Sequence, residues 1–134
     1  MRIFVLSLAC PIASLVCVET SAAQSLNLTR FAESGIDSLI AQERAWDQNC
    51  NALPVTVTLT KIPVNGAISV VVGVTSTIPS STDASGSTAT CAGKTVTGNE
   101  VRYKSKAGFH GTDSVSYTVS NQPQRPRVII INVK

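Results

Sequence analysis

Residues that carry most enzyme chemistry are scarce in this 134-residue sequence, which holds one histidine, one tryptophan and one methionine. It contains no Gly-x-Ser-x-Gly nucleophile elbow and no glycine-rich phosphate loop. A Ser–His–Asp site would have to use His110, whose place in a glycine-bounded turn predicts an exposed side chain. We therefore expect no catalytic residues, no cofactor and no enzymatic activity.

Charge is also sparse. Charged residues make up 14% of the chain, and the formal net charge is +3. A net charge this small is usual for a protein surface and gives no reason to expect a nucleic-acid partner. In place of charge, the sequence is rich in Val, Ile and Thr, the residue types that favour strands.

The start of the chain has the features of a bacterial-type secretion signal. Met1-Arg2 supplies a positive charge, an apolar stretch follows from Ile3 to Val18, and the small residues Ser21-Ala22-Ala23 come next. The apolar stretch is shorter than the ~20 residues of a membrane span. We expect a cleavable signal over residues 1–23, no membrane span after cleavage, and a secreted or periplasmic protein. An uncleaved anchor and a lipid-modified Cys10 are the alternatives.

Cleavage of this signal would leave two cysteines, Cys50 and Cys91. An even pair of cysteines in an oxidising compartment predicts a structural disulfide. Two cysteines and one histidine cannot form a closed zinc site without carboxylates, and His110 with Asp113 would supply only two ligands. We therefore expect no metal.

The hydrophobic pattern divides the mature chain at about residue 54. Between Thr29 and Asp47 the apolar residues fall broadly on one helical stripe, which would pack Leu39 and Trp46 onto the rest of the protein. We predict a leader over residues 24–53 that contains one short helix. A disordered leader is the alternative.

Residues 54–134 predict a mainly β domain, because β-branched residues alternate with polar ones between turn signals. The clearest strand surrounds Val115, Tyr117 and Val119, and Asn65-Gly66 is the strongest hairpin signal. Residues 75–90, rich in Ser and Thr, are expected to form a long mobile loop. Thr95–Thr97 and Glu100–Ser105 are expected as separate strands, with a turn at Gly98-Asn99. Arg127–Val133 is expected to be covered on both faces. Six or so short strands predict an antiparallel β-sandwich.

A recurring signature lies between Val101 and Val119: a Tyr, a short gap, Gly-Phe-x-Gly-x-Asp, an apolar residue and a second Tyr. The matching positions are Tyr103, Gly108, Phe109, Gly111, Asp113, Val115 and Tyr117. Upstream, Pro63–Gly66 is similar to the Pro-x-x-Gly turn that opens a hairpin in the same modules. On these residues the chain resembles a bacterial Ig-like (cadherin-like) domain in a single copy over about residues 54–134. The resemblance implies an Ig-like sandwich of a secreted or surface protein.

Each signature residue has an expected structural role. The two glycines permit a sharp corner, and Phe109 packs beneath it. Asp113 caps backbone N–H groups of the turn, and Tyr117 anchors the corner through its hydroxyl. The sequence has no acidic calcium-binding linker such as Asp-x-Asn-Asp, so calcium-stiffened tandem adhesion is not expected.

Three cations alternate along one predicted strand, at Arg102, Lys104 and Lys106, and should therefore share one face. Arg125 and Arg127 would extend this cationic row. Such a row would hold an anionic envelope polymer. The alternative is a solvated strand face whose charges prevent edge pairing.

Together these features predict a non-enzymatic exported module that binds or scaffolds at the bacterial cell envelope. Its partner would be an unknown protein or an anionic envelope polymer, and its oligomeric state is not predicted. The alternative is a small secreted inhibitor or regulator of an envelope or host enzyme, with the loop at residues 75–90 as its inserting element.

Overall fold

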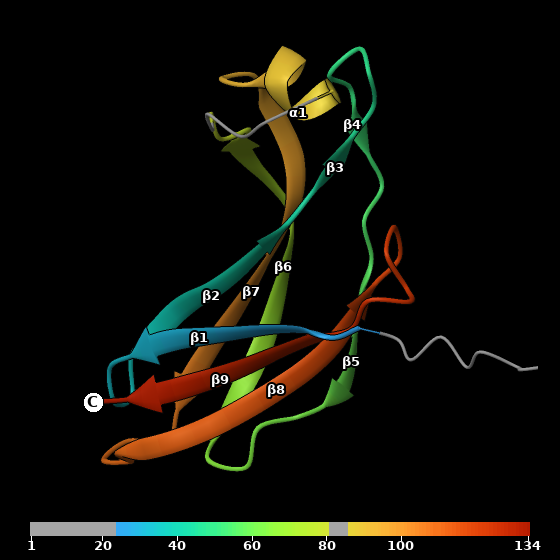
Figure 1. Ribbon diagram of the computed structural model, residues 1–134. Coiled ribbons are helices and arrows are strands. Elements are labelled where there is room, and N and C mark those ends of the chain that lie inside the picture. The colour runs from blue at the N-terminus through green and yellow to red at the C-terminus, as the bar shows by residue number, and fades with distance from the viewer. Residues whose placement is uncertain (1–23, 81–85) are drawn as a thin grey trace, which may run out of the picture.

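The computed structural model describes residues 24–80 and 86–134, so the expected secretion signal at residues 1–23 lies outside the described residues. The described chain is folded almost entirely into strands (Figure 1). In chain order the elements are β1 (Leu26–Ala32), β2 (Asp37–Glu43), β3 (Ala45–Trp46), β4 (Ala52–Leu53), β5 (Val57–Lys61), β6 (Gly66–Thr77), α1 (Gly86–Cys91), β7 (Thr95–Ser105), β8 (Gly111–Val119) and β9 (Arg127–Val133).

These strands form the predicted β-sandwich. One sheet has the order β1-β9-β8-β5, and the facing sheet has the order β2-β7-β6 (Figure 1). All neighbouring strands are antiparallel except β1 and β9, which run parallel. The short β3–β4 pair and α1 lie together beyond one end of the four-stranded sheet, beside the start of β7.

Strand alternation builds the main core, and it places Val101, Tyr103, Val115, Tyr117 and Val119 on the inner face as the sequence predicts. Side chains from both sheets meet between the layers, each no more than 1% exposed: Ile40, Val101, Tyr103, Val115, Tyr117, Val119, Ile129 and Ile131. Burying an apolar side chain of this size stabilises the fold by about 1.5–3 kcal/mol. On β9 the cover is on one face only, because Ile130 is 37% exposed while its neighbours are buried. The expectation of cover on both faces of that strand is therefore wrong.

The helix predicted within residues 24–53 is also wrong, because that segment forms strands. Gly35 adopts φ +72° in a turn where the Ile36 N–H donates to the Glu33 carbonyl oxygen (3.1 Å). The chain reverses there and continues as β2, so the apolar residues follow a period of two and Phe31 is left 64% exposed. Pairing of β1 with β9 and of β2 with β7 outweighs the weak helical preference of a segment that contains glycine. Both sheets therefore take strands from the segment before residue 54.

Two expected interruptions of the three-stranded sheet are replaced by continuous strands. Strand β7 runs unbroken through Gly98, so the expected turn at Gly98-Asn99 is absent from this strand. A Cβ at Gly98 would lie 2.8 Å from the Cβ of Arg44, and glycine permits this close approach of the two chain segments. Opposite it, β6 continues to Thr77 with a bulge at Gly73 (φ +74°). The loop expected at residues 75–90 is shorter than predicted, since α1 begins at Gly86.

A second, smaller cluster lies beside β3, β4 and α1. Ile78, Cys91 and Val96 are buried there, and Trp46 and Cys50 pack against them. Cys50 and Cys91 are joined by the disulfide that the sequence predicts, with their Cα atoms 5.4 Å apart. The disulfide thus fastens the loop after β3 to the end of α1.

Removing this disulfide should loosen the smaller cluster before the sandwich. Closing a loop of about 42 residues stabilises a fold by about 4 kcal/mol in the chain-entropy model. We expect the Cys50→Ser/Cys91→Ser variant to melt about 15 °C below the wild type. Hydrogen exchange should accelerate first in β3, β4 and α1, while β8 stays protected. Two free thiols in denatured, unreduced wild-type protein would contradict the prediction, as would an unchanged melting temperature.

Candidate functional site

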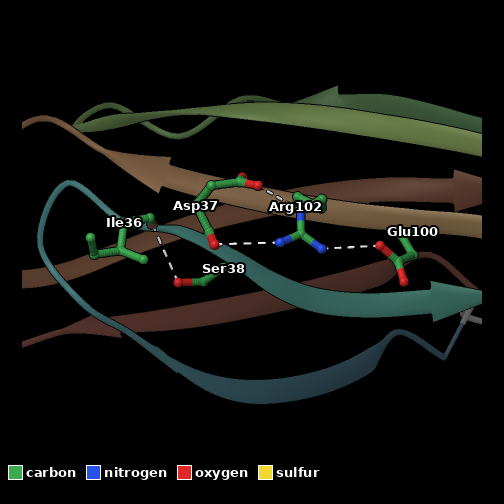
Figure 2. Close-up of polar contacts among 5 residues, drawn as sticks. All are labelled: Ile36, Asp37, Ser38, Glu100 and Arg102. Atoms are coloured by element: carbon green, nitrogen blue, oxygen red, sulfur yellow. Dashed lines mark hydrogen bonds and ion pairs between the residues drawn. The ribbon is translucent and has the colours of Figure 1, made fainter.

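The cationic row predicted on β7 is partly neutralised in the structure (Figure 2). Arg102 Nε lies 2.7 Å from Oδ2 of Asp37 on β2, and its Nη1 lies 3.0 Å from Oε2 of Glu100 on its own strand. The hydrogen bond to Asp37, and then the one to Glu100, raises the pKa of Arg102 above its ordinary value. Arg102 is therefore held between two carboxylates.

The other cations of the expected patch are differently placed. Lys104 is exposed on β7, and Lys106 lies past the end of the strand, where its Nζ donates to the Val64 carbonyl oxygen (3.1 Å). Arg127 does not extend the row, because its side chain is buried between the sheets. Arg125 is exposed in the turn before β9. The row with its two carboxylates carries a net charge of +1, from three cations and two anions.

The glycine-rich corner between β7 and β8 has the expected geometry. Gly108 (φ +78°) and Gly111 (φ +141°) both adopt backbone conformations that favour glycine. Phe109 is half-buried under the corner, and His110 is exposed at its tip. The corner therefore directs the only histidine of the sequence into solvent.

Asp113 is the best-connected carboxylate among the described residues. It is 6% exposed, and it accepts the backbone N–H groups of Val64 (3.0 Å), Asn65 (2.9 Å) and Ser114 (2.9 Å). The Tyr103 hydroxyl donates to the same carboxylate across the sandwich (3.0 Å). Asp113 thus caps the turn before β6 as well as its own strand, and it ties the two sheets together at one end.

This Asp113–Tyr103 tie sets the protonation of both residues. Burial acts to raise the pKa of Asp113, but the four hydrogen bonds to its carboxylate outweigh burial and lower the pKa below the ordinary value of 3.8. Burial, followed by the hydrogen bond to Asp113, raises the pKa of the Tyr103 hydroxyl. The carboxylate is therefore charged and the phenol neutral at any physiological pH.

A second tie closes the opposite end of the sandwich, and the sequence did not predict it. The Tyr117 hydroxyl donates to Oε1 of Glu43 (2.7 Å), and Arg127 Nε lies 3.4 Å from the same oxygen. Burial and then the bond to Glu43 raise the pKa of Tyr117. The expectation that Tyr117 anchors the corner is therefore wrong. Its hydroxyl holds β2 against β8 instead. Glu43 was missed because a register shift after Leu39 moves it onto the inner face.

Asp113→Asn should remove one acceptor from the Asp113–Tyr103 tie. An amide NH₂ would then face a backbone N–H, and an unsatisfied buried donor costs about 1–3 kcal/mol. Because the native pKa is depressed, the wild-type advantage is complete only above about pH 5, about one unit above the unfolded pKa, and it is lost as the pH falls through the native value. Urea unfolding of both proteins from pH 7 to pH 2 measures the difference. Glu33→Gln, at an exposed carboxylate, is the control, and a pH-independent difference would contradict the assignment.

Removing a carboxylate from Arg102 should expose the cationic row. We expect Asp37→Asn to elute from heparin beads at higher salt than Glu33→Gln, although each change raises the net charge by one. The reason is that Asp37 compensates Arg102 directly, whereas Glu33 lies in the β1–β2 turn. Co-elution of the two variants would show that the row does not bind polyanions.

No helix among the described residues is long and apolar enough to span a membrane. In the same part of the chain, no group of three His, Cys, Asp or Glu residues is placed to hold a metal ion.

A comparison with curated proteins finds no match. A family model described as "Bacterial Ig domain" matches residues 46–133, from β3 through β9. The match includes the signature around Tyr103 and Asp113 from which the sequence predicts this family. Because the match covers well over half of the sequence, the chain belongs to the bacterial Ig domain family.

Proposed function

We propose that this protein is a non-enzymatic exported Ig-like module that binds or scaffolds at the bacterial cell envelope. The observation that carries the proposal is the use made of the signature residues. Tyr103, Asp113 and Tyr117 are all buried in hydrogen bonds between the two sheets. The polar groups of these three residues thus hold the sandwich together and are not available for chemistry. Binding of a partner would use the outer surface of the domain.

The export part of the proposal has two supports. Residues 1–23 carry the features of a secretion signal, and a disulfide persists in oxidising compartments but rarely in the cytosol. Bacterial Ig domains usually occur in extracellular or surface proteins, which agrees with this location.

The surface favours a protein partner over an anionic polymer. Arg102 is already compensated by Asp37 and Glu100. The outer face of β8 carries an uncharged column of Thr112, Ser114, Ser116 and Thr118. Uncharged hydroxyl groups can hydrogen-bond to a partner but add none of the positive charge that attracts a polyanion.

Export is tested by expressing the full chain in a bacterial host with a C-terminal tag. We expect the purified protein to begin at Gln24 and to fractionate with the periplasm or the medium, because signal peptidase requires small residues before the cut. Ala23→Phe is the matched control, and it should leave the signal attached. A wild-type protein that begins at Met1 in the cytoplasmic fraction would contradict the proposal.

Binding is tested on the same cells with a membrane-impermeable amine cross-linker. We expect a discrete adduct between the tagged chain and one envelope protein, identified by mass spectrometry. Recovery of the monomer alone at every cross-linker concentration would contradict a scaffolding or binding role.

A further inference from the structure

Strand β6 is an unprotected sheet edge. It pairs with β7 on one side, and no strand of the described chain pairs with its other side. Its twelve residues include no charged residue and no proline, two of the devices that usually prevent edge pairing, and the bulge at Gly73 is its one irregularity. The other edge strands are less open to pairing. Strand β1 carries Arg30, whose Nε donates to the Ile40 carbonyl oxygen of the edge strand β2 (2.9 Å). Strand β5 is five residues long and has a register shift before Lys61.

The exposed side chains of β6 are apolar where the strand bulges. Val72 is 73% exposed and Val71 is 42% exposed. Val72 stands opposite buried Asn99, so its side chain lies on the sandwich side of the sheet, where nothing covers most of it. Val71 and Val72 therefore give this part of the edge strand exposed apolar surface on both faces of the sheet.

A groove of about 290 Å³ lies beside this part of β6. Its walls come from the Ala52–Val55 segment on one side and from Gly73 and Thr97–Asn99 on the other. The Asn99 amide donates to the Val55 carbonyl oxygen (2.7 Å) and so holds the first wall in place. Gly73 of β6 has no side chain, and no other atom lies within 4 Å of the position that its Cβ would occupy. The groove is therefore open at this point of the edge strand. No charged residue lines the groove.

We propose that the free edge of β6 and this groove form a β-strand addition site for an extended, uncharged segment of a partner protein. The inference deepens the proposed function and rests on it. Main-chain hydrogen bonds to β6 would supply affinity, and alternate side chains of the added strand would enter the groove beside Leu53 and Pro54. A charged side chain finds no partner there and would be costly to bury, so the groove selects apolar, β-branched residues.

The proposal is tested with a displayed library of random ten-residue linear peptides, selected on the disulfide-bonded mature chain. We expect selected peptides to lack proline and to carry β-branched residues at alternate positions. Val72→Lys should weaken their binding at least tenfold, because it places a cation on the edge strand directly before Gly73, which lines the groove. The matched control is Val64→Lys, the same change at a valine that is 74% exposed in the β5–β6 loop; it should leave binding unchanged. Peptide binding should also slow hydrogen exchange in β6.

Several results would overturn the strand addition site. They are a library without binders, binders that tolerate Val72→Lys, and binders that slow exchange elsewhere than β6. A wild-type chain that dimerises in sedimentation, while Val72→Lys stays monomeric, would replace the partner segment with a second copy and so overturn the occupant named here. The peptide readout does not depend on export. If Val72→Lys still forms the envelope adduct, the proposed function stands and this inference fails.

Discussion

The buried carboxylate of Asp113 is the constraint on which the arrangement of this sandwich depends. It satisfies two backbone N–H groups of the turn before β6 and accepts the Tyr103 hydroxyl from the facing sheet. The Tyr103 ring in turn requires Gly66, where a Cβ would lie 2.7 Å from its Cζ atom. One anion thus fixes a turn, a cross-sheet contact and the start of an edge strand. Removing it would leave the buried Tyr103 hydroxyl and three part-buried N–H groups without their acceptor, which costs more than any single hydrogen bond contributes.

Apolar burial supplies most of the stability, and the polar ties specify how the layers are aligned. Sheets packed only through Val and Ile can slide with little change in buried area, whereas a phenol–carboxylate bond has a defined length and direction. The second tie, between Tyr117 and Glu43, lies at the opposite end of the sandwich and includes Arg127. Two separated ties and one disulfide therefore hold the two sheets and the smaller cluster of Ile78 in one arrangement.

Among the described strands, the same organisation leaves β6 as a long sheet edge that carries no charge. Exposed uncharged strands are an aggregation hazard, and proteins usually place lysine, proline or a short strand at such edges. Here β6 is long, carries neither residue and departs from regularity only at the Gly73 bulge. A protein that retains such an edge gains a surface for strand recognition, which needs no catalytic group and no cofactor.

The sequence alone determined the features that depend on local chemistry. Alternation placed Val101, Tyr103 and Val115 in the core, glycine preference formed the corner at Gly108, and the spacing around Asp113 indicated the family. Tertiary structure decided whatever depends on a partner far along the chain. The segment containing Phe31 and Leu39 became strands because β9 and β7 offered it backbone ladders. Glu43 turned inward through a register shift, and Arg102 acquired two carboxylates. The apolar pattern of this segment is compatible with a helical stripe as well as with a strand, so the outcome depends on which backbone groups find partners, and those partners are chosen when the two sheets assemble.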